Sequence, residues 1–153
     1  MGRHLRILPV ILVSVLPLLA CTDKGVSPED TLRPGGAPVT YHYRAYNSKG
    51  AVAVSGTMIL ASTDSTHISG TWSFELQIAG EQVGPQVGSG TLAGSRQQAT
   101  ISINLNPGWA DNNVYLTGTI GPNGINGRWD WSTFVGTSAT GSFNAVFRDI
   151  VIQ

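Results

Sequence analysis

The stretch Ile68–Leu76, ISGTWSFEL, recurs in outline fifty-seven residues later as Ile125–Thr133, INGRWDWST. In both stretches glycine or a large apolar residue alternates with a polar one. Successive side chains of a β-strand point to opposite faces, so a period of two indicates a strand with one buried and one exposed face. Both stretches therefore predict strands that cover a core on one side only.

The same alternation continues along the chain from Val39 onward, and no segment of useful length keeps a helical period. Turn-forming clusters separate the alternating runs at Asn47–Gly50, Ser62–Ser65, Ala79–Gln86, Gly94–Gln97, Asn106–Asn113, Gly121–Gly124 and Val135–Ser138. Seven short breaks give eight strands and leave no room for crossover helices. We therefore expect an all-β domain, an eight-stranded antiparallel up-and-down meander that closes into a small barrel; the alternative is a two-sheet β-sandwich.

A short phrase recurs on several of these strands, as in SGTM at Ser55–Met58 and SGTW at Ser69–Trp72. A glycine inside a strand weakens it, so its repetition at matching positions indicates a geometric requirement. Strands that coil around a narrow axis crowd their inward side chains, and glycine relieves that crowding. We expect the following glycines to line the barrel interior: Gly56, Gly70, Gly90, Gly118, Gly127 and Gly141.

The first twenty residues have the pattern of an export signal. A basic start precedes Ile7–Ala20, a fourteen-residue apolar run, which is shorter than the about 20 residues of a transmembrane helix. The run ends at Leu18–Cys21, LLAC, which resembles the lipobox of bacterial lipoproteins. That resemblance implies cleavage before Cys21, a lipid on its sulfur and, with Thr22 next, the outer membrane of a Gram-negative cell. The alternative is an ordinary signal peptide followed by an incidental thiol.

Three regions follow from these patterns. Residues 1–20 form the signal peptide, residues 21–38 the lipidated cysteine and a flexible tether, and residues 39–153 a single barrel domain. The tether contains three prolines and three glycines with almost no apolar bulk, so it cannot offset its conformational entropy by burial. Cys21 is the only cysteine, which excludes an intrachain disulfide.

Gly70-Thr71-Trp72 and Gly127-Arg128-Trp129 resemble the G-x-W motif of lipocalins and avidins, the small calycin-like barrels. The resemblance implies a small apolar ligand bound inside the barrel. The alternation places six aromatic residues on the inward face, as candidates for ligand binding or for the barrel interior: Trp72, Phe74, Trp129, Trp131, Phe143 and Phe147. The interior of an eight-stranded barrel is either filled by side chains or holds one small ligand, and both outcomes are open here.

Charge and motif content exclude several function classes. The net charge is zero, and no basic patch exists for nucleic acid. Beyond the signal the histidines are His42 and His67, both at outward positions without cysteine or carboxylate at ligand spacing, so no metal is expected. We find no G-x-S-x-G elbow, no paired-carboxylate motif and no phosphate-binding loop, and therefore expect no catalytic residues and no cofactor.

Trp109 is the remaining candidate, because it lies in the turn Asn106–Asn113. It either caps one barrel end or serves as an exposed anchor for a partner. We expect a non-enzymatic lipoprotein, exported and anchored to the cell envelope, that binds a small apolar ligand in its barrel. The alternative is a structural or protein-interaction barrel with a filled core, such as an envelope accessory or an inhibitor of an exported enzyme.

Overall fold

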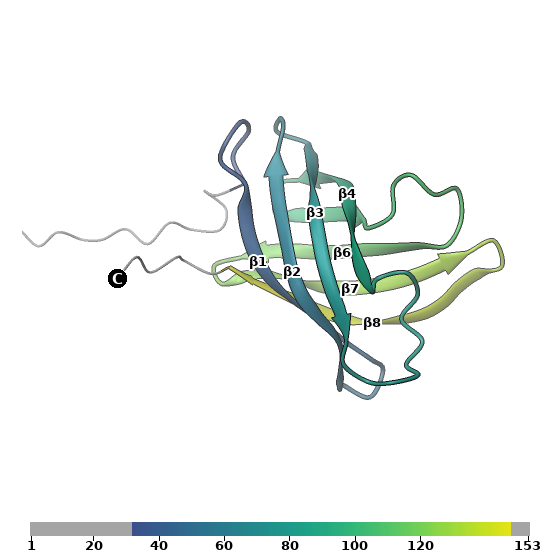
Figure 1. Cartoon of the computed structure of the whole chain (residues 1–153). Helices are drawn as coiled ribbons and strands as arrows, with labels where there is room; N and C mark the ends of the chain where they lie inside the picture. The colour runs from purple at the N-terminus through teal and green to yellow at the C-terminus, as the bar shows by residue number, and fades with distance from the viewer. Residues whose placement is uncertain (1–31, 148–153) are drawn as a thin grey trace, which may run out of the picture.

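A computed structural model describes residues 32–147, and within this range the chain contains strands but no helix. The strands are β1 (Val39–Tyr46), β2 (Val52–Ser62), β3 (His67–Leu76), β4 (Gly88–Gln97), β5 (Thr100–Asn104), β6 (Asn113–Gly121), β7 (Gly124–Thr133) and β8 (Gly136–Phe147). Each pairs antiparallel with the next, and β1 pairs with β8 to close the barrel (Figure 1). The predicted all-β meander and its closure are confirmed, and the sandwich alternative is wrong.

The meander sorts its connections to two opposite ends of the barrel. The β2–β3, β4–β5 and β6–β7 turns share one end with the start of β1 and the finish of β8; we call this the terminal end. The other end, which we call the loop end, carries the β1–β2, β3–β4, β5–β6 and β7–β8 connections. In Figure 1 the β5–β6 loop and the β7–β8 hairpin extend to the right, away from the two ends of the described chain.

The six predicted interior glycines all lie against neighbouring strands. A Cβ added at any of them would come within 3.0 Å of another heavy atom. At Gly127 the added carbon would lie 2.8 Å from Phe143 Cε1, and at Gly141 it would lie 2.7 Å from Trp129 Nε1. Five of the missing side chains thus make room for an aromatic ring, and at Gly70 the backbone of β2 occupies the space, as expected for a narrow barrel.

Aromatic rings fill much of the interior. Tyr43 stacks on Phe74 with ring centroids 4.2 Å apart, and Phe143 lies 5.6 Å from Tyr43 on a neighbouring strand. Aliphatic side chains surround them, and the following are each 0% exposed: Met58, Leu60, Ile101, Ile103 and Leu116. Burial of this apolar surface is the main source of stability in such a domain.

The predicted inward aromatic residues divide into two groups. Trp72, Phe74, Trp129 and Phe143 are at most 4% exposed. Trp131 and Phe147 pack against the core but are only partly buried. The reason is their position, since both lie near the ends of their strands, where the barrel wall no longer covers them.

Two predicted turns are shorter than their composition indicated. Residues 94–97 belong to β4, and the chain reverses at residues 98 and 99, where Gln98 has a φ of 54°. Residues 136–138 belong to β8, and the reversal is confined to Phe134 and Val135. Both predictions failed because glycine and serine also occur inside the strands of this barrel: a Cβ at Gly94 would lie 2.8 Å from Ile103 Cα, the close packing that the other strand glycines show.

The barrel begins its packing before the predicted boundary at Val39. Leu32 is 1% exposed, and its carbonyl accepts a hydrogen bond of 3.0 Å from Arg96 Nη1. The Gly35 amide donates to the Ser62 carbonyl at 2.9 Å. The described part of the predicted tether therefore lies on the terminal end of the barrel. The predicted signal peptide and Cys21 lie outside the described residues.

Candidate functional site

The β3–β4 loop, residues 77–87, covers the loop end of the barrel. Its Val83 and Gln86 are 4% and 0% exposed. The Tyr43 hydroxyl donates to Gln86 Oε1 at 3.1 Å, and Gln86 Nε2 donates to the Val83 carbonyl at 2.9 Å. At the loop's outer side, Asn47 Nδ2 donates to Glu81 Oε2 at 3.1 Å. The loop is therefore hydrogen-bonded to Tyr43 inside the barrel and to Asn47 of the β1–β2 turn outside it.

Tyr43 makes the free energy of unfolding depend on pH in the alkaline range. Burial raises the pKa of the Tyr43 hydroxyl well above its ordinary value of about 10. Above pH 10 the unfolded chain releases this proton while the folded chain retains it, so the free energy of unfolding falls as pH rises. We expect Tyr43→Phe to flatten this fall. At neutral pH it should cost about 1–3 kcal/mol, because Gln86 Oε1 loses its donor.

Urea unfolding of the wild type and of Tyr43→Phe between pH 7 and pH 11 measures both effects. Tyr115→Phe is the matched control, since Tyr115 is 39% exposed and should leave the pH dependence unchanged. Equal alkaline slopes for wild type and Tyr43→Phe would contradict the assignment.

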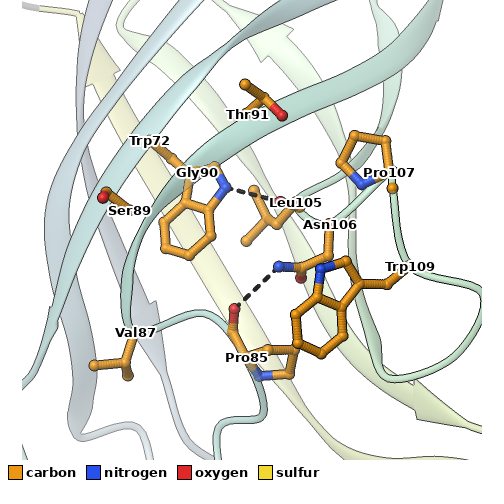
Figure 2. A pocket seen from close by; sticks show the side chains of 11 residues that line it. Trp72, Pro85, Val87, Ser89, Gly90, Thr91, Leu105, Asn106, Pro107 and Trp109 are labelled. Atoms are coloured by element: carbon orange, nitrogen blue, oxygen red, sulfur yellow. Dashed lines mark hydrogen bonds between the residues drawn. The ribbon is translucent and has the colours of Figure 1, made fainter.

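Next to this closure lies a pocket of about 400 Å³ between the β3–β4 and β5–β6 loops and the start of β4. Figure 2 shows the indole of Trp72 on one side and that of Trp109 on the other, with Leu105 and Asn106 between them. Pro85 adds an apolar edge from the β3–β4 loop. The pocket lies at the loop end, and two indole rings contribute to its walls.

The two tryptophans are held in different ways. Trp72 is 4% exposed, and its Nε1 donates to the Leu105 carbonyl at 2.8 Å. Trp109 is 60% exposed, while its backbone amide donates to the Asn106 carbonyl and its own carbonyl accepts from Asn113 Nδ2, both at 3.1 Å. The backbone of Trp109 is thus fixed while its ring faces solvent.

Gly90 shapes the floor of the pocket. A Cβ at this position would lie 3.0 Å from Trp72 Nε1 and 3.1 Å from Trp72 Cε2. Trp72 cannot move away easily, because its indole nitrogen is hydrogen-bonded to Leu105. The absence of a side chain at Gly90 therefore lets the Trp72 ring lie close against β4.

The polar groups of the pocket are few and neutral. None of the described residues that line it has an ionisable side chain, and the polar side chains are those of Ser89, Thr91 and Asn106. Asn106 Nδ2 donates to the Pro85 carbonyl at a long 3.4 Å. Asn106 Oδ1 is buried and has no hydrogen-bond partner among residues 32–147. The site can therefore bind an uncharged molecule that offers both apolar surface and a hydrogen-bond donor.

The structure places the predicted candidates in two locations. Trp72 and Trp109 meet at the pocket, whereas Phe74, Trp129 and Phe143 belong to the core. Trp109 is the exposed member, and its role as an anchor for a partner stays a prediction. Composition gave no reason to select Pro85 or Asn106, because their approach depends on the conformations of two separate loops.

The β7–β8 hairpin adds a second apolar feature at the loop end. Phe134 and Val135 occupy its turn and are 85% and 95% exposed. A small hollow of about 140 Å³ lies between this hairpin and the β5–β6 loop, and Tyr115 contributes to its lining. Apolar residues are unusual in a two-residue hairpin turn, where glycine and asparagine are preferred.

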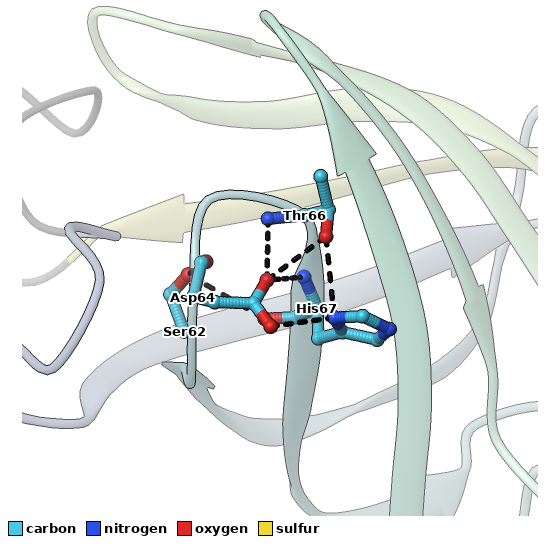
Figure 3. Close-up of polar contacts among 4 residues, drawn as sticks. All are labelled: Ser62, Asp64, Thr66 and His67. Carbon is cyan, nitrogen blue, oxygen red and sulfur yellow. Dashed lines mark hydrogen bonds and ion pairs between the residues drawn. The ribbon is translucent and has the colours of Figure 1, made fainter.

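A polar cluster at the terminal end is structural in character (Figure 3). Asp64 Oδ1 accepts from the backbone amides of Thr66 and His67 at 2.8 Å, and Oδ2 pairs with His67 Nδ1 at 2.7 Å. The two backbone hydrogen bonds hold the pKa of Asp64 well below its ordinary range. Within residues 32–147 no nucleophile is hydrogen-bonded to His67 Nε2, so the cluster serves as a cap for the β2–β3 turn.

Two further features, a group of metal ligands and a membrane-spanning helix, are absent from the described part of the chain. No three His, Cys, Asp or Glu side chains of residues 32–147 lie together as a metal site. No helix in that range is long and apolar enough to cross a membrane.

No protein-family model matches the chain, and comparisons with curated proteins and with solved structures likewise find no match. Function must therefore be inferred from the geometry of the loop end.

Proposed function

We propose that this protein is a non-enzymatic, lipid-anchored binding protein of the bacterial cell envelope, which takes its ligand at the loop end of the barrel. One observation carries the proposal: a pocket of about 400 Å³ without ionisable side chains lies beside a tryptophan that is 60% exposed. Small-molecule sites are typically concave, about 300–1,000 Å³, and apolar with a few polar groups. The Trp109 pocket falls within this range of volume, and its lining combines apolar and neutral polar groups.

The packing of the interior supports a site at the barrel end rather than inside it. Tyr43, Phe74 and Phe143 pack against one another where a calycin-like ligand would lie. Gln86 of the β3–β4 loop is hydrogen-bonded to Tyr43, so an internal ligand would have to displace this loop. A filled core with a binding site at its mouth fits these contacts better than a ligand enclosed by the barrel.

The position of the predicted anchor supports a ligand on the side away from the membrane. Leu32 packs at the terminal end, eleven residues after Cys21. An extended chain of that length reaches at most about 40 Å. Because the chain that follows Cys21 reaches the barrel at its terminal end, we expect the membrane on that side and the loop end pointing away from it. In a Gram-negative cell we place the anchor in the outer membrane.

A second candidate function is protein interaction through the β7–β8 hairpin. Phe134 and Val135 are 85% and 95% exposed at its tip, and exposed apolar groups of this kind occur at partner-binding sites. An envelope partner could bind there without using the pocket.

In-cell photo-crosslinking of the full-length protein separates the two candidates. Gly108 lines the pocket and has no heavy atom within 4 Å of an added Cβ, so a photoreactive residue fits there with Trp109 intact. We expect an adduct from position 108 that is lost when Trp109→Ala is added, and none from Thr117, an outward residue in β6.

The photoreactive residue at position 134 tests the second candidate. An adduct from Phe134 that persists in Trp109→Ala would favour protein interaction through the hairpin. If the adduct at position 108 forms equally with and without Trp109, the proposed site is wrong.

A further inference from the structure

We propose that the ligand of the pocket is a neutral carbohydrate, with one face of a sugar ring on the Trp109 indole and a hydroxyl hydrogen-bonded to Asn106. This inference rests on the proposed function and names the class of ligand for that site. Four observations point to it.

The exposed indole of Trp109 offers a flat apolar surface. Its backbone is held by hydrogen bonds of 3.1 Å to Asn106 and Asn113, so binding requires little further ordering of the loop. The C–H face of a pyranose is apolar while its rim carries hydroxyls. Such a ring can stack on an aromatic face and keep its polar rim available to other groups.

The neutral lining excludes charged ligands. A carboxylate, phosphate or sulfate that entered the pocket would lose water without meeting a compensating cation, which is costly. The polar groups of the described lining residues are hydroxyl, amide, indole N–H and backbone groups, none of them charged. An acidic peptide, a nucleotide or an acidic polysaccharide therefore does not suit this site.

The unpartnered acceptor of Asn106 favours a ligand that donates a hydrogen bond. Its Oδ1 is buried without a partner among residues 32–147, and its Nδ2 contact with the Pro85 carbonyl is long at 3.4 Å. The terminal amide torsion of asparagine is broad, so the group can turn towards a ligand. Alkyl chains carry no donor, and proline has no backbone N–H. Sugar hydroxyls both donate and accept.

The shape of the floor adds a specificity element. Gly90 sets how close the Trp72 ring lies to β4, because a Cβ there would lie 3.0 Å from Trp72 Nε1. Trp72 is 4% exposed and lies across the pocket from Trp109, so a methyl group added at Gly90 would displace the wall opposite Trp109 (Figure 2). Gly90→Ala should narrow this floor while leaving the exposed indole in place.

Calorimetric titration of the full-length mature protein in lipid nanodiscs tests the inference. The panel contains neutral oligosaccharides of glucose, galactose and N-acetylglucosamine, acidic oligosaccharides of equal length, a proline-rich peptide and a medium-chain alcohol. We expect saturable binding of a neutral oligosaccharide. Trp109→Ala should weaken this binding by about 30-fold or more, as for an aromatic hot spot, and Asn106→Ala and Gly90→Ala by smaller factors.

Phe134→Ala is the matched control, because it removes an exposed aromatic ring at the same end without touching the pocket, and should change affinity less than about twofold. Thermal unfolding of each variant shows whether it is folded. The 60% exposure of Trp109 predicts that Trp109→Ala folds normally.

Trp109-dependent binding confined to the acidic oligosaccharides, the peptide or the alcohol would overturn the carbohydrate inference and leave the proposed binding function intact. If no compound of the panel binds, fragmentation of the photo-adduct at position 108 tests the carbohydrate inference instead. Hexose or N-acetylhexosamine fragments would support the inference, and an adduct of other composition would reject it. The lack of any Trp109-dependent adduct or binding would reject the site itself.

Discussion

Gly127→Ala is expected to lower the free energy of unfolding by about 3 kcal/mol or more, the upper range for overpacking a closed core. The added Cβ would overlap the Thr117 carbonyl oxygen and lie 2.8 Å from Phe143 Cε1. Its direct cross-strand partner is Gly118, and a Cβ added at either glycine would lie close to the Phe143 ring. The Thr117 carbonyl is part of the backbone ladder and cannot move without disturbing β6. A loss of this size is a large share of the about 5–15 kcal/mol that stabilises a typical domain.

Urea unfolding followed by tryptophan fluorescence measures the effect. Gly121→Ala provides a control in the same hairpin, because the nearest heavy atom to an added Cβ is 3.9 Å away and the φ of Gly121 is not positive. We expect the control to change stability by less than about 1 kcal/mol, and it can be stabilising through reduced entropy of the unfolded chain. Equal stabilities of Gly127→Ala and Gly121→Ala would refute the explanation given for the repeated glycines.

Cys21→Ser is expected to abolish lipid attachment completely. The resemblance of Leu18–Cys21 to a lipobox implies that the thiol carries the lipid and that processing follows lipidation. Each buried CH₂ of an acyl chain contributes about 0.8 kcal/mol to membrane binding, and more than one chain is needed for durable anchoring. Without the thiol no chain can be added, and the precursor should retain residues 1–20.

Labelling of cells with a radioactive fatty acid, together with the intact mass of the purified chain, checks this expectation. Thr22→Ser is the control, since it changes the adjacent residue but keeps the thiol, and should be labelled and processed as the wild type. A Cys21→Ser chain that is cleaved normally would favour the ordinary signal peptide with an incidental thiol.

The fold could be predicted because most strands alternate cleanly between apolar and polar residues. The alternation in β3 and β7 identified the inward rings Trp72, Phe74 and Trp129, which are all buried. The exact turns could not be predicted where the strand itself is rich in glycine and serine, as in residues 94–97. The burial of Leu32 was not predicted, because one apolar residue in a polar segment gives no periodic signal.

The candidate site was predictable only in part. Trp109 drew attention because a large aromatic residue in a turn needs an explanation, and it proved to be 60% exposed. Asn106 lies in the same turn, but its unsatisfied oxygen depends on the geometry of the β3–β4 loop. Contacts between loops are tertiary, and no periodicity in the sequence records them.

The seam between β1 and β8 has a consequence for biogenesis. It pairs residues 41–45 of β1 with residues 143–147 of β8. Strand β1 is synthesised first, but it can pair with β8 only after this last strand has been synthesised. An exported chain is threaded across a membrane from its N-terminus, and until β8 emerges the nascent sheet keeps two unpaired edges. Such edges recruit other strands. For the exported protein that we propose, we therefore expect the chain to stay unfolded or chaperoned until translocation is complete.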